Sequence, residues 1–237
     1  MVQALKLGSL YLDGKSIAPE AKYQPGQTIS FGEAAPDMAI SWVPVNGLLI
    51  ADQCLLTNVS WDDLDAQGLV SGKEITVQGF RFKIRLLKVG SEDNVPNEWD
   101  AALDTAGEYD PLWHWRGKYF WGQESVSGVA SYRVVRGYRS ARLYNWNISS
   151  GRGASFGFRP ALVPLDTEQL GPTLLGQQLM LWGGQSIVSG RLEQVTDYDA
   201  VLSNWSGTRP TGKDFSSQLP NGDLVVNRKA IAGVQKS

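Results

Sequence analysis

The chain has 237 residues, of which 42% are hydrophobic and 19% charged, and its formal net charge is −2. This composition excludes a disordered chain, and the missing excess of basic residues argues against general nucleic-acid binding. With 26 Gly, 11 Pro and no long apolar helical pattern, the sequence favours β structure with many turns. The length suits one large domain, or one of roughly 150 residues with a smaller companion.

The number of cysteines and the length of the apolar runs exclude several kinds of site and segment. The single cysteine, Cys54, excludes an internal disulfide and a multi-cysteine zinc site, and no metal or other cofactor is predicted. Cys54 lies inside an apolar run, where it is expected to be a small buried hydrophobe. The N-terminus lacks an apolar core of signal-peptide length, and no run approaches 18 apolar residues. The sequence therefore predicts synthesis in the cytoplasm without membrane insertion.

Residues 1–50 are expected to form short strands separated by turns, and a helix is expected to follow between Ser60 and Gly68. An Asp13-Gly14 turn predicts a hairpin, and the apolar run from Asn46 predicts a further strand that contains Cys54. Ser60 is a good helix N-cap, and Asp63 three residues later completes a capping-box pattern. Gly68 is expected to end this helix.

A hairpin over residues 75–87 and a second helix follow. The hairpin is predicted to turn at Gln78-Gly79, with one buried face and one wet face. The buried face takes Phe80, Phe82, Ile84 and Leu86, and the wet face takes Arg81, Lys83 and Arg85. The helix is expected to have Pro96 in its first turn, an apolar stripe and a stop at Gly107. The stripe consists of Trp99, Ala102, Leu103 and Ala106. A calcium site at Asn97, Glu98 and Asp100 is an alternative to the helix-start interpretation of these residues.

Residues 113–160 have the composition of a binding surface. They hold four of the nine Trp, and from Ser125 to Leu165 there are six Arg and no Asp, Glu or Lys. Aromatic residues and Arg supply anchors, while Ser, Asn and Gly adapt the fit. The alternative is that Trp and Arg build a core with ion pairs. The lone His114 has no nucleophile or orienting acid at a recognisable spacing, so we expect a packed or hydrogen-bonded histidine rather than a general base.

Two motifs in this stretch resemble a known family. RGYRSAR at 136–142 and GFRPAL at 157–162 are similar to the C-terminal signature of the formylglycine-generating-enzyme branch of the C-type lectin fold. The resemblance covers about residues 40–165 and implies an α+β domain in which two helices flank small twisted antiparallel sheets. Because Arg has five donors in a fixed fork, Arg136, Arg142 and Arg159 are expected to tie loops to backbone carbonyls or buried acids. Within this branch, the closer similarity is to variable proteins that retroelements diversify in bacteria and phages.

The diversification that this resemblance implies is directed at adenines. Changing the adenines of an Asn codon that ends in a pyrimidine yields Asn, Ser, Tyr, Arg, Leu and Ile among others, but never Trp, Lys, Glu, Gln or Met. Gly137, Ser140, Ala141, Arg142 and Trp146 would then be fixed by the template. The expected ligand-binding face consists of Tyr138, Arg139, Leu143, Tyr144, Asn145, Trp146, Asn147, Ser149, Ser150 and Arg152.

The sequence departs from the enzymes of the family. Those enzymes bind copper through paired cysteines, which a chain with only Cys54 does not have. Where the family has RGGSW, this chain has Tyr138 and Arg139 before Ser140, as diversification of those positions would produce. The calcium-dependent sugar site of ordinary C-type lectins is not visible either. The resemblance therefore implies a binding protein and no enzyme.

The last seventy residues differ in character. We divide the chain into an N-terminal β segment (1–39), a C-type-lectin-like domain (40–166) and a β-rich extension (167–237). The extension is expected to form strands around Gly183-Gly184, a late hairpin at 221–227 and an extended docking arm at 203–223. Residues 10–17 and 179–187 are alike and are expected to pair as β elements from the two ends of the chain.

These observations predict a ligand-binding display protein, such as a receptor-binding subunit of a phage tail or virion surface. Its partners would be a protein or glycan receptor on a cell surface and, through its termini, other virion subunits, and homo-oligomerisation stays open. One alternative is a structural virion protein without diversification, and another is a formylglycine-generating-type oxidoreductase. Exposure of residues 143–153 separates the first two, because a structural subunit would cover them.

Overall fold

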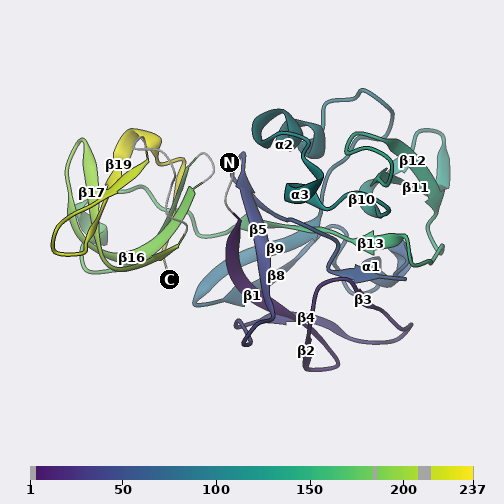
Figure 1. Ribbon diagram of the computed structural model, residues 1–237, viewed down its shortest axis with the longest axis horizontal. Helices are drawn as coiled ribbons and strands as arrows, with labels where there is room; N and C mark the ends of the chain where they lie inside the picture. The colour runs from purple at the N-terminus through teal and green to yellow at the C-terminus, as the bar shows by residue number, and fades with distance from the viewer. Residues whose placement is uncertain (1–3, 184–185, 208–214, 237) are drawn as a thin grey trace.

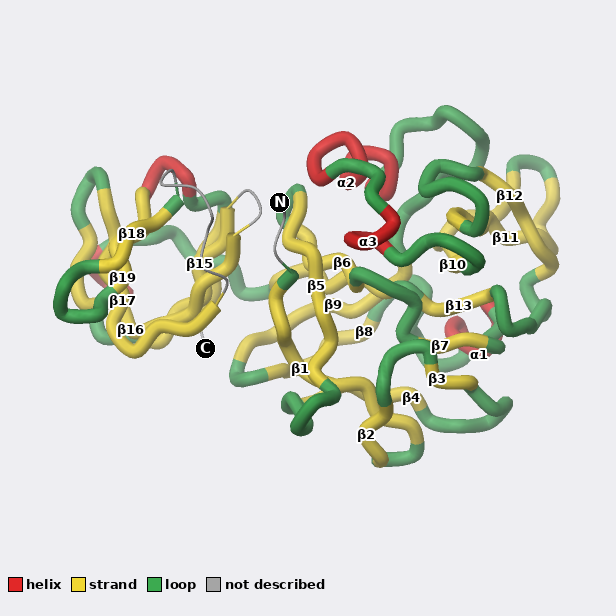
Figure 2. Tube along the Cα trace, viewed as in Figure 1, coloured by secondary structure: helices red, strands yellow, loops and turns green. Residues whose placement is uncertain are grey.

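The computed structural model describes residues 4–183, 186–207 and 215–236, which form two packed units (Figure 1). The larger unit contains two β-sheets and three α-helices, and the smaller unit, after residue 166, is built on one sheet. Over the described residues the fold is therefore a sheet-rich α+β fold with few helices. The tube in Figure 2 shows how little of the chain is helical.

The first sheet has eight strands and is antiparallel throughout. Its order is β2-β1-β5-β6-β14-β9-β8, and β4 also pairs with β1. The strands are β1 (Leu5–Leu12), β2 (Lys15–Ile17), β4 (Ile29–Gly32), β5 (Ala39–Val45), β6 (Leu48–Ala51), β8 (Lys73–Val77), β9 (Phe80–Leu86) and β14 (Pro160–Pro164). Because β1 pairs with β5, the expected division at residue 39/40 is not a structural boundary.

The second sheet has six strands in the order β12-β11-β10-β13-β7-β3. They are β3 (Ala21–Lys22), β7 (Leu56–Thr57), β10 (Tyr119–Val126), β11 (Val129–Gly137), β12 (Tyr144–Ile148) and β13 (Phe156–Phe158). Strand β13 runs parallel to β10, whereas β10, β11 and β12 form an antiparallel meander with β12 at the edge. Residues 144–148 of the aromatic stretch thus form an edge of this sheet.

The two hairpin turns that were predicted at an Asp-Gly and a Gln-Gly dipeptide are confirmed. Asp13 and Gly14 have φ of 50° and 76°, and Gln78 and Gly79 have φ of 52° and 80°. Positive φ at both central residues matches the right-handed twist of the flanking strands. One expectation for the second hairpin is wrong: Arg85 is 9% exposed, because it forms an ion pair with Glu98 instead of facing water.

Three α-helices occur in the described residues: α1 (Trp61–Asp65), α2 (Glu98–Ala106) and α3 (Asp110–Trp113). The Ser60–Asp63 capping box of α1 is confirmed, although the helix is short. Helix α2 buries the whole expected stripe, and Gly107 ends it with a φ of 84°. Its N-cap is Asn97, so Pro96 precedes the helix rather than lying in its first turn. Helix α3 was not predicted from the sequence.

The smaller unit has a six-stranded sheet in the order β18-β19-β17-β16-β15-β20. The strands are β15 (Gln178–Gly183), β16 (Ser186–Val195), β17 (Asp199–Gly207), β18 (Ser216–Gln218), β19 (Leu224–Asn227) and β20 (Gly233–Lys236), with 3₁₀ turns η1 (Pro172–Leu174) and η2 (Arg228–Ala230). The late hairpin β18–β19 is confirmed. The strands expected around Gly183-Gly184 are present, while Gly184 itself lies outside the described residues.

Two expectations for this unit are wrong. The described parts of the arm at 203–223 belong to the sheet, and Phe215 is buried in its core, so this segment is no extended arm. Residues 208–214 of that prediction lie outside the described residues. Strands β1 and β15 belong to different sheets and do not pair, because each has closer antiparallel neighbours.

The units share an apolar interface because β15 has two buried faces. Leu179 and Leu181 belong to the core of the smaller unit, whereas Met180 and Trp182 join the main core of the larger one. The side chain of Gln235 also donates a hydrogen bond to the carbonyl of Arg81. In Figure 1, the smaller unit and the β11–β12 hairpin lie at opposite ends of the long axis.

Candidate ligand-binding surface

Arginines anchor the scaffold beneath the predicted binding face, as the sequence analysis expected. Arg136 is 1% exposed, and its guanidinium lies 2.5 Å from the carboxylate of Asp100. Arg142 lies 2.6 Å from both Asp104 and Glu108. These ion pairs bind the β11–β12 turn to helix α2. They also neutralise Asp100, one of the three residues in the alternative calcium hypothesis.

Arg159 is the most deeply buried cation of the scaffold. It has no exposed surface, and it donates hydrogen bonds to the carbonyl oxygens of Asp52 (3.1 Å) and Trp113 (2.5 Å). Its guanidinium also lies 5.2 Å from the Trp99 ring, within cation–π range. Burial lowers the pKa of Arg159. Since its donors hold two loops of the larger unit, its expected structural role is confirmed.

The β11–β12 hairpin sorts the predicted residues onto two faces. The backbone amide of Ser149 donates to Ser131 and that of Gly137 to Leu143, which makes Tyr144, Trp146 and Ile148 the non-hydrogen-bonded positions of β12. The side chains of these three residues point to the side of helix α2. The side chains of Asn145 and Asn147 point to the side of helix α1, because alternate residues of a strand face opposite sides.

On the α1 side, four aromatic rings form a continuous stack. The Tyr138 ring stacks on Tyr119 at 4.8 Å and 9°, and Tyr119 stacks in turn on Phe156, which stacks on Trp121. The side-chain amide of Asn145 donates to the Tyr119 hydroxyl at 3.0 Å. Tyr138 has a φ of 77°, a region that favours glycine. The structure thus brings Tyr138 and Asn145 together.

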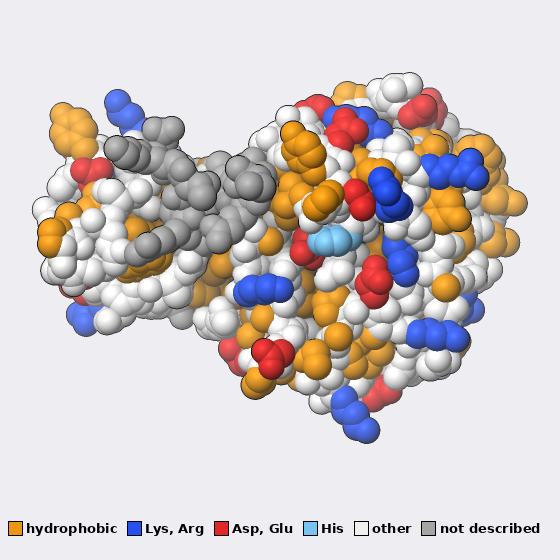
Figure 3. Space-filling view, viewed as in Figure 1, with side chains coloured by type: hydrophobic (Ala, Val, Ile, Leu, Met, Phe, Trp, Pro, Cys, Tyr) orange, Lys and Arg blue, Asp and Glu red, His pale blue; other side chains and the backbone are white. Residues whose placement is uncertain are grey.

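On the α2 side, four side chains form what we call the apolar strip: Tyr132, Tyr144, Trp146 and Ile148. Tyr132 pairs with Ile148 across the ladder, and these residues are 37% and 45% exposed. Trp146 is 53% exposed and lies beside Tyr144 with 6.5 Å between ring centroids. Tyr132 and Ile148 are not among the residues predicted from the sequence, although period-two alternation along β11 and β12 could have identified them. Hydrophobic side chains gather at this end of the molecule in Figure 3.

The loop after β12 is held to helix α1. The side chain of Arg152 lies 2.7 Å from a carboxylate oxygen of Asp63, and the amide of Asp62 donates to Ser149 at 3.2 Å. Burial raises the pKa of Asp63, but hydrogen bonds from Arg152 and Ser60 outweigh it and leave this pKa below its ordinary value. Arg152 therefore positions the loop in addition to facing solvent. Ser150 is exposed beside it.

Arg139 and Leu143 lie in the β11–β12 turn, away from both faces of the strand. Arg139 is exposed, and among the described residues its guanidinium has no hydrogen-bond or ion-pair partner. Leu143 is half-buried, and its amide donates to the carbonyl of Ser140 at 3.2 Å. None of the ten predicted residues is buried, yet they form two adjoining surfaces and a turn rather than one continuous face.

On the outer edge of β12, two backbone amides already donate hydrogen bonds to side chains of the same strand. At the non-hydrogen-bonded positions, backbone N–H groups point away from β11. The amide of Trp146 donates to the side-chain oxygen of Asn145 at 2.8 Å, and that of Ile148 donates to Asn147 at 2.9 Å. Asparagine side chains thus occupy two donors that another strand would need.

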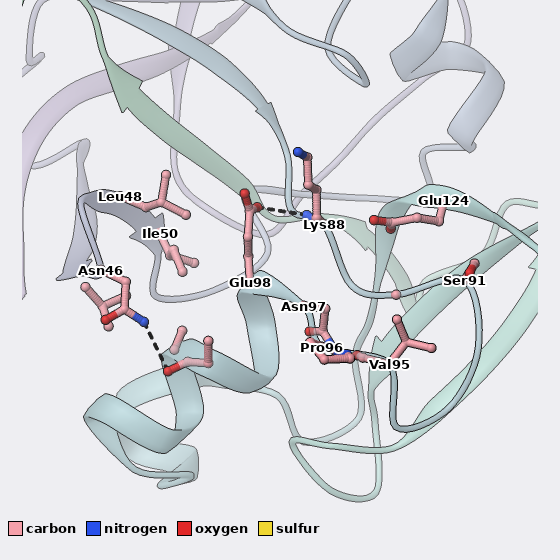
Figure 4. A pocket seen from close by; sticks show the side chains of 14 residues that line it. Asn46, Leu48, Ile50, Lys88, Ser91, Val95, Pro96, Asn97, Glu98 and Glu124 are labelled. Atoms are coloured by element: carbon pink, nitrogen blue, oxygen red, sulfur yellow. Dashed lines mark hydrogen bonds between the residues drawn. The ribbon is translucent and has the colours of Figure 1, made fainter.

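A cavity of about 610 Å³ lies between hairpin β5–β6, the loop at 88–97 and helix α2 (Figure 4). Its polar groups mostly bind their own scaffold. Glu98 accepts from Arg85 and from the amide of Lys88, and Asn46 donates to the carbonyl of Ala101. Burial raises the pKa of Glu98, but the bonds from Arg85 and Lys88 leave it lowered overall. The cavity offers apolar walls and few polar groups that are free to bind a ligand.

The remaining reactive residues do not form a catalytic arrangement in the described part of the chain. Cys54 is fully buried as expected, but it lies between β6 and β7 rather than inside a strand, and burial raises its pKa. His114 is exposed with a φ of 44°, and its Nδ1 lies 3.4 Å from the carbonyl oxygen of Asp52, so it is hydrogen-bonded but not packed. No cluster of three potential metal ligands occurs among the described residues.

Comparison with protein-family models gave no match. Comparisons with curated proteins and with solved structures gave none either. Among the described helices, none is long and apolar enough to cross a membrane.

Proposed function

We propose that this protein is a ligand-binding display protein with a C-type-lectin-like larger unit, and that hairpin β11–β12 carries its diversifiable binding surface. A phage or prophage particle is the setting that we infer from the sequence resemblance. The receptor would be a protein or glycan on a cell surface. No enzymatic activity is proposed.

The observation that carries this proposal is the exposure of the predicted binding-face residues, compared with that of the residues expected to stay constant. The ten residues of the predicted binding face lie at exposed or half-buried sites on the hairpin and its loops. Of the residues that are expected to stay constant, Ala141 is 1% exposed, Arg142 is held by acids of the α2 region and Gly137 has a φ of 103°, whereas Ser140 and Trp146 are exposed. Three of the five residues that are expected to stay constant thus support the backbone, while the residues that are expected to vary have access to solvent, as recognition on a rigid scaffold requires.

The shape of the molecule also supports display. The hairpin and the smaller unit lie at opposite ends of the long axis, so attachment through one end leaves the other accessible (Figure 1). The predicted contacts of the termini with other virion subunits suit this arrangement, because the C-terminal strand β20 belongs to the smaller unit.

The test is deep sequencing of the gene in a growing population of its source. Substitutions confined to adenine positions in the codons of residues 138–152 are expected, with Gly137, Ala141 and Arg142 constant. Codons 215–236, in the smaller unit, serve as the internal control. A uniform sequence over 138–152 would remove diversification from the proposal.

A fixed structural subunit is the second candidate, and Trp146 favours it. This residue cannot arise from the Asn codon, yet it is among the most exposed large hydrophobic side chains described. A constant exposed Trp suits an interface with a constant partner. Cross-linking through a cysteine introduced at Ser150 in intact particles distinguishes the two, since only a structural subunit would cross-link to a neighbour there.

A further inference from the structure

We propose that the apolar strip and the acidic loop beside it form a docking surface for a cationic protein segment, one that carries Lys or Arg among aliphatic or aromatic residues. This inference deepens the proposed function and rests on it only in that both place binding on β12. It specifies the chemistry of the partner and assigns its binding to the α2 side of β12.

The first support is the geometry of the apolar strip. The cross-strand pairs Tyr132–Ile148 and Val134–Trp146 lie next to each other on the α2 side, with Val134 fully buried beneath the exposed Trp146. Large apolar side chains that adjoin one another on a surface mark interaction sites more often than isolated ones do. The hydroxyl of Tyr144 donates to the carbonyl of Ser91 at 2.8 Å, which fixes the inner end of the strip.

The second support is an unbalanced negative charge next to the strip. The same Ser91 carbonyl also accepts from the amide of Ser127 at 3.3 Å, so the loop that starts at Ser91 lies against the β10–β11 hairpin. Glu92 and Asp93 are exposed on this loop, and neither forms an ion pair in the described part of the chain. Glu124 of β10 accepts from the amide of Val89 and has no ion-pair partner among the described residues.

Around Tyr144, the acidic side chains outweigh the basic ones. Burial raises the pKa of the Tyr144 hydroxyl, the carboxylates of Glu92, Asp93 and Glu124 raise it further, and Arg136 acts in the opposite direction. Arg136 is already paired with Asp100 and is 1% exposed, so it offers no cation to a partner. Lys88 is the basic residue that lines the neighbouring cavity with Glu124. The surface around Tyr144 is therefore apolar with an acidic border.

The third support concerns the backbone of β12. Asn145 and Asn147 occupy the outward amides of Trp146 and Ile148, whereas the outward carbonyls of Tyr144 and Trp146 accept no hydrogen bond from the residues that the structure describes. An added β-strand needs donors along this edge, so strand addition is disfavoured. Lys and Arg side chains bring donors only, and they also bind the face of an exposed Trp ring. The acceptors on the β12 edge, the Trp146 ring and the acidic residues therefore all favour a partner that carries Lys or Arg.

The experiment uses the full chain and two short fluorescent peptides that share the same Leu, Phe and Ser residues and differ in carrying either Lys or Glu. We expect the Lys peptide to bind about tenfold or more tightly than the Glu peptide, and this preference to shrink in about 1 M salt, where charges are screened beyond about 3 Å. Equal binding of the two peptides, or preference for the Glu peptide, would overturn the proposal.

Variants locate the surface. The double substitution Glu92→Gln with Asp93→Asn is expected to remove most of the preference for Lys, and Trp146→Ala to weaken Lys-peptide binding by about tenfold. The matched control is Asp65→Asn, an exposed acid at the end of α1, which should leave binding unchanged. A preference that survives the double substitution, or that Asp65→Asn removes, contradicts the assignment.

Two further outcomes are informative. Sedimentation that shows a dimer lost with Trp146→Ala would make the strip an interface between two copies of this chain and overturn the cationic partner. If the Lys preference holds while residues 138–152 never vary, the docking chemistry stands and the proposal of diversified display fails.

Discussion

At the scale of single residues, buried arginine chemistry dominates the larger unit. Arg159 donates to backbone carbonyls from a fully buried position, and no shorter or unforked cation reaches the same acceptors. Leaving buried carbonyls without donors is expensive, since each unsatisfied group costs about 1–3 kcal/mol. The GFRPAL motif is therefore a structural requirement of the loops around Asp52 and Trp113.

Arg159→Lys should lower the free energy of unfolding by about 3 kcal/mol, because the lysine leaves carbonyl acceptors unpaired around a buried charge. Urea denaturation monitored by Trp fluorescence measures this change. Arg139→Lys is the matched control on the surface and should shift the midpoint negligibly. Equal stability of the two variants would show that the carbonyl contacts of Arg159 contribute little.

Tyr138 combines an unfavourable backbone with a favourable ring contact. Its positive φ restricts which residues can replace it, although its position is predicted to vary. Asn tolerates the left-handed region, and β-branched residues do not. Tyr138→Val should therefore be less stable than Tyr138→Asn by about 1–2 kcal/mol. Thermal unfolding of both variants tests this difference, and the reverse order would contradict the backbone argument.

At the scale of elements, helix α2 is fixed to the first sheet through charge. Glu98 accepts two hydrogen bonds from Arg85 of β9, at 2.7 and 2.8 Å. Its folded-state pKa is lowered, so this contribution to stability is complete above the ordinary value of 4.5 and is lost as pH falls through the lower folded value. The pair links strand and helix only while Glu98 is ionised.

Glu98→Gln should flatten the dependence of stability on pH below about pH 4.5. Denaturant midpoints measured across the acid range give the slope for wild type and variant. Glu74→Gln, at an exposed ion pair of the same sheet, is the control and should leave the slope close to that of wild type. A wild-type slope in the Glu98 variant would assign the acid sensitivity to other carboxylates.

Strand β12 gives a prediction about its edge. Replacing both Asn145 and Asn147 by Ala frees the outward amides of Trp146 and Ile148, so the edge regains the donors for pairing with another chain. The double variant should self-associate at concentrations where wild type and Ser150→Ala do not. Analytical ultracentrifugation checks this outcome. A monomeric double variant would show that the amides alone do not control pairing.

The sequence predicts an element well when the residues that determine it are close together in the chain. The Asp13-Gly14 and Gln78-Gly79 turns and the Ser60–Asp63 cap follow from residues within a few positions, and all are confirmed. Arg85 was misplaced because its partner Glu98 comes from the next element. The burial of Phe215 was missed for the same reason, since it depends on a sheet whose strands lie apart in sequence. None of the candidate residues is buried, but their division between two faces needed the register of β11 with β12.

At the scale of the whole molecule, the smaller unit is packed on the larger one through alternate residues of β15. Met180 faces the larger unit, and Leu181 faces its own core. Met180→Asp should separate the unfolding of the two units while both stay folded, giving two calorimetric transitions in place of one. Leu181→Asp, the neighbouring control, should instead unfold the smaller unit itself. A single unchanged transition in the Met180 variant would show that other contacts couple the units.

The opposite placement of the hairpin and the smaller unit has a consequence for binding strength. If many copies are fixed through their smaller units on one particle, their hairpins face the same target surface together. Each attached copy then raises the effective concentration of the next, and avidity can exceed the single-site affinity by about 10²–10⁴-fold without any new contact. A weak, exchangeable contact on each hairpin is sufficient for firm attachment under those conditions, so most sequence changes on the hairpin would weaken adhesion gradually.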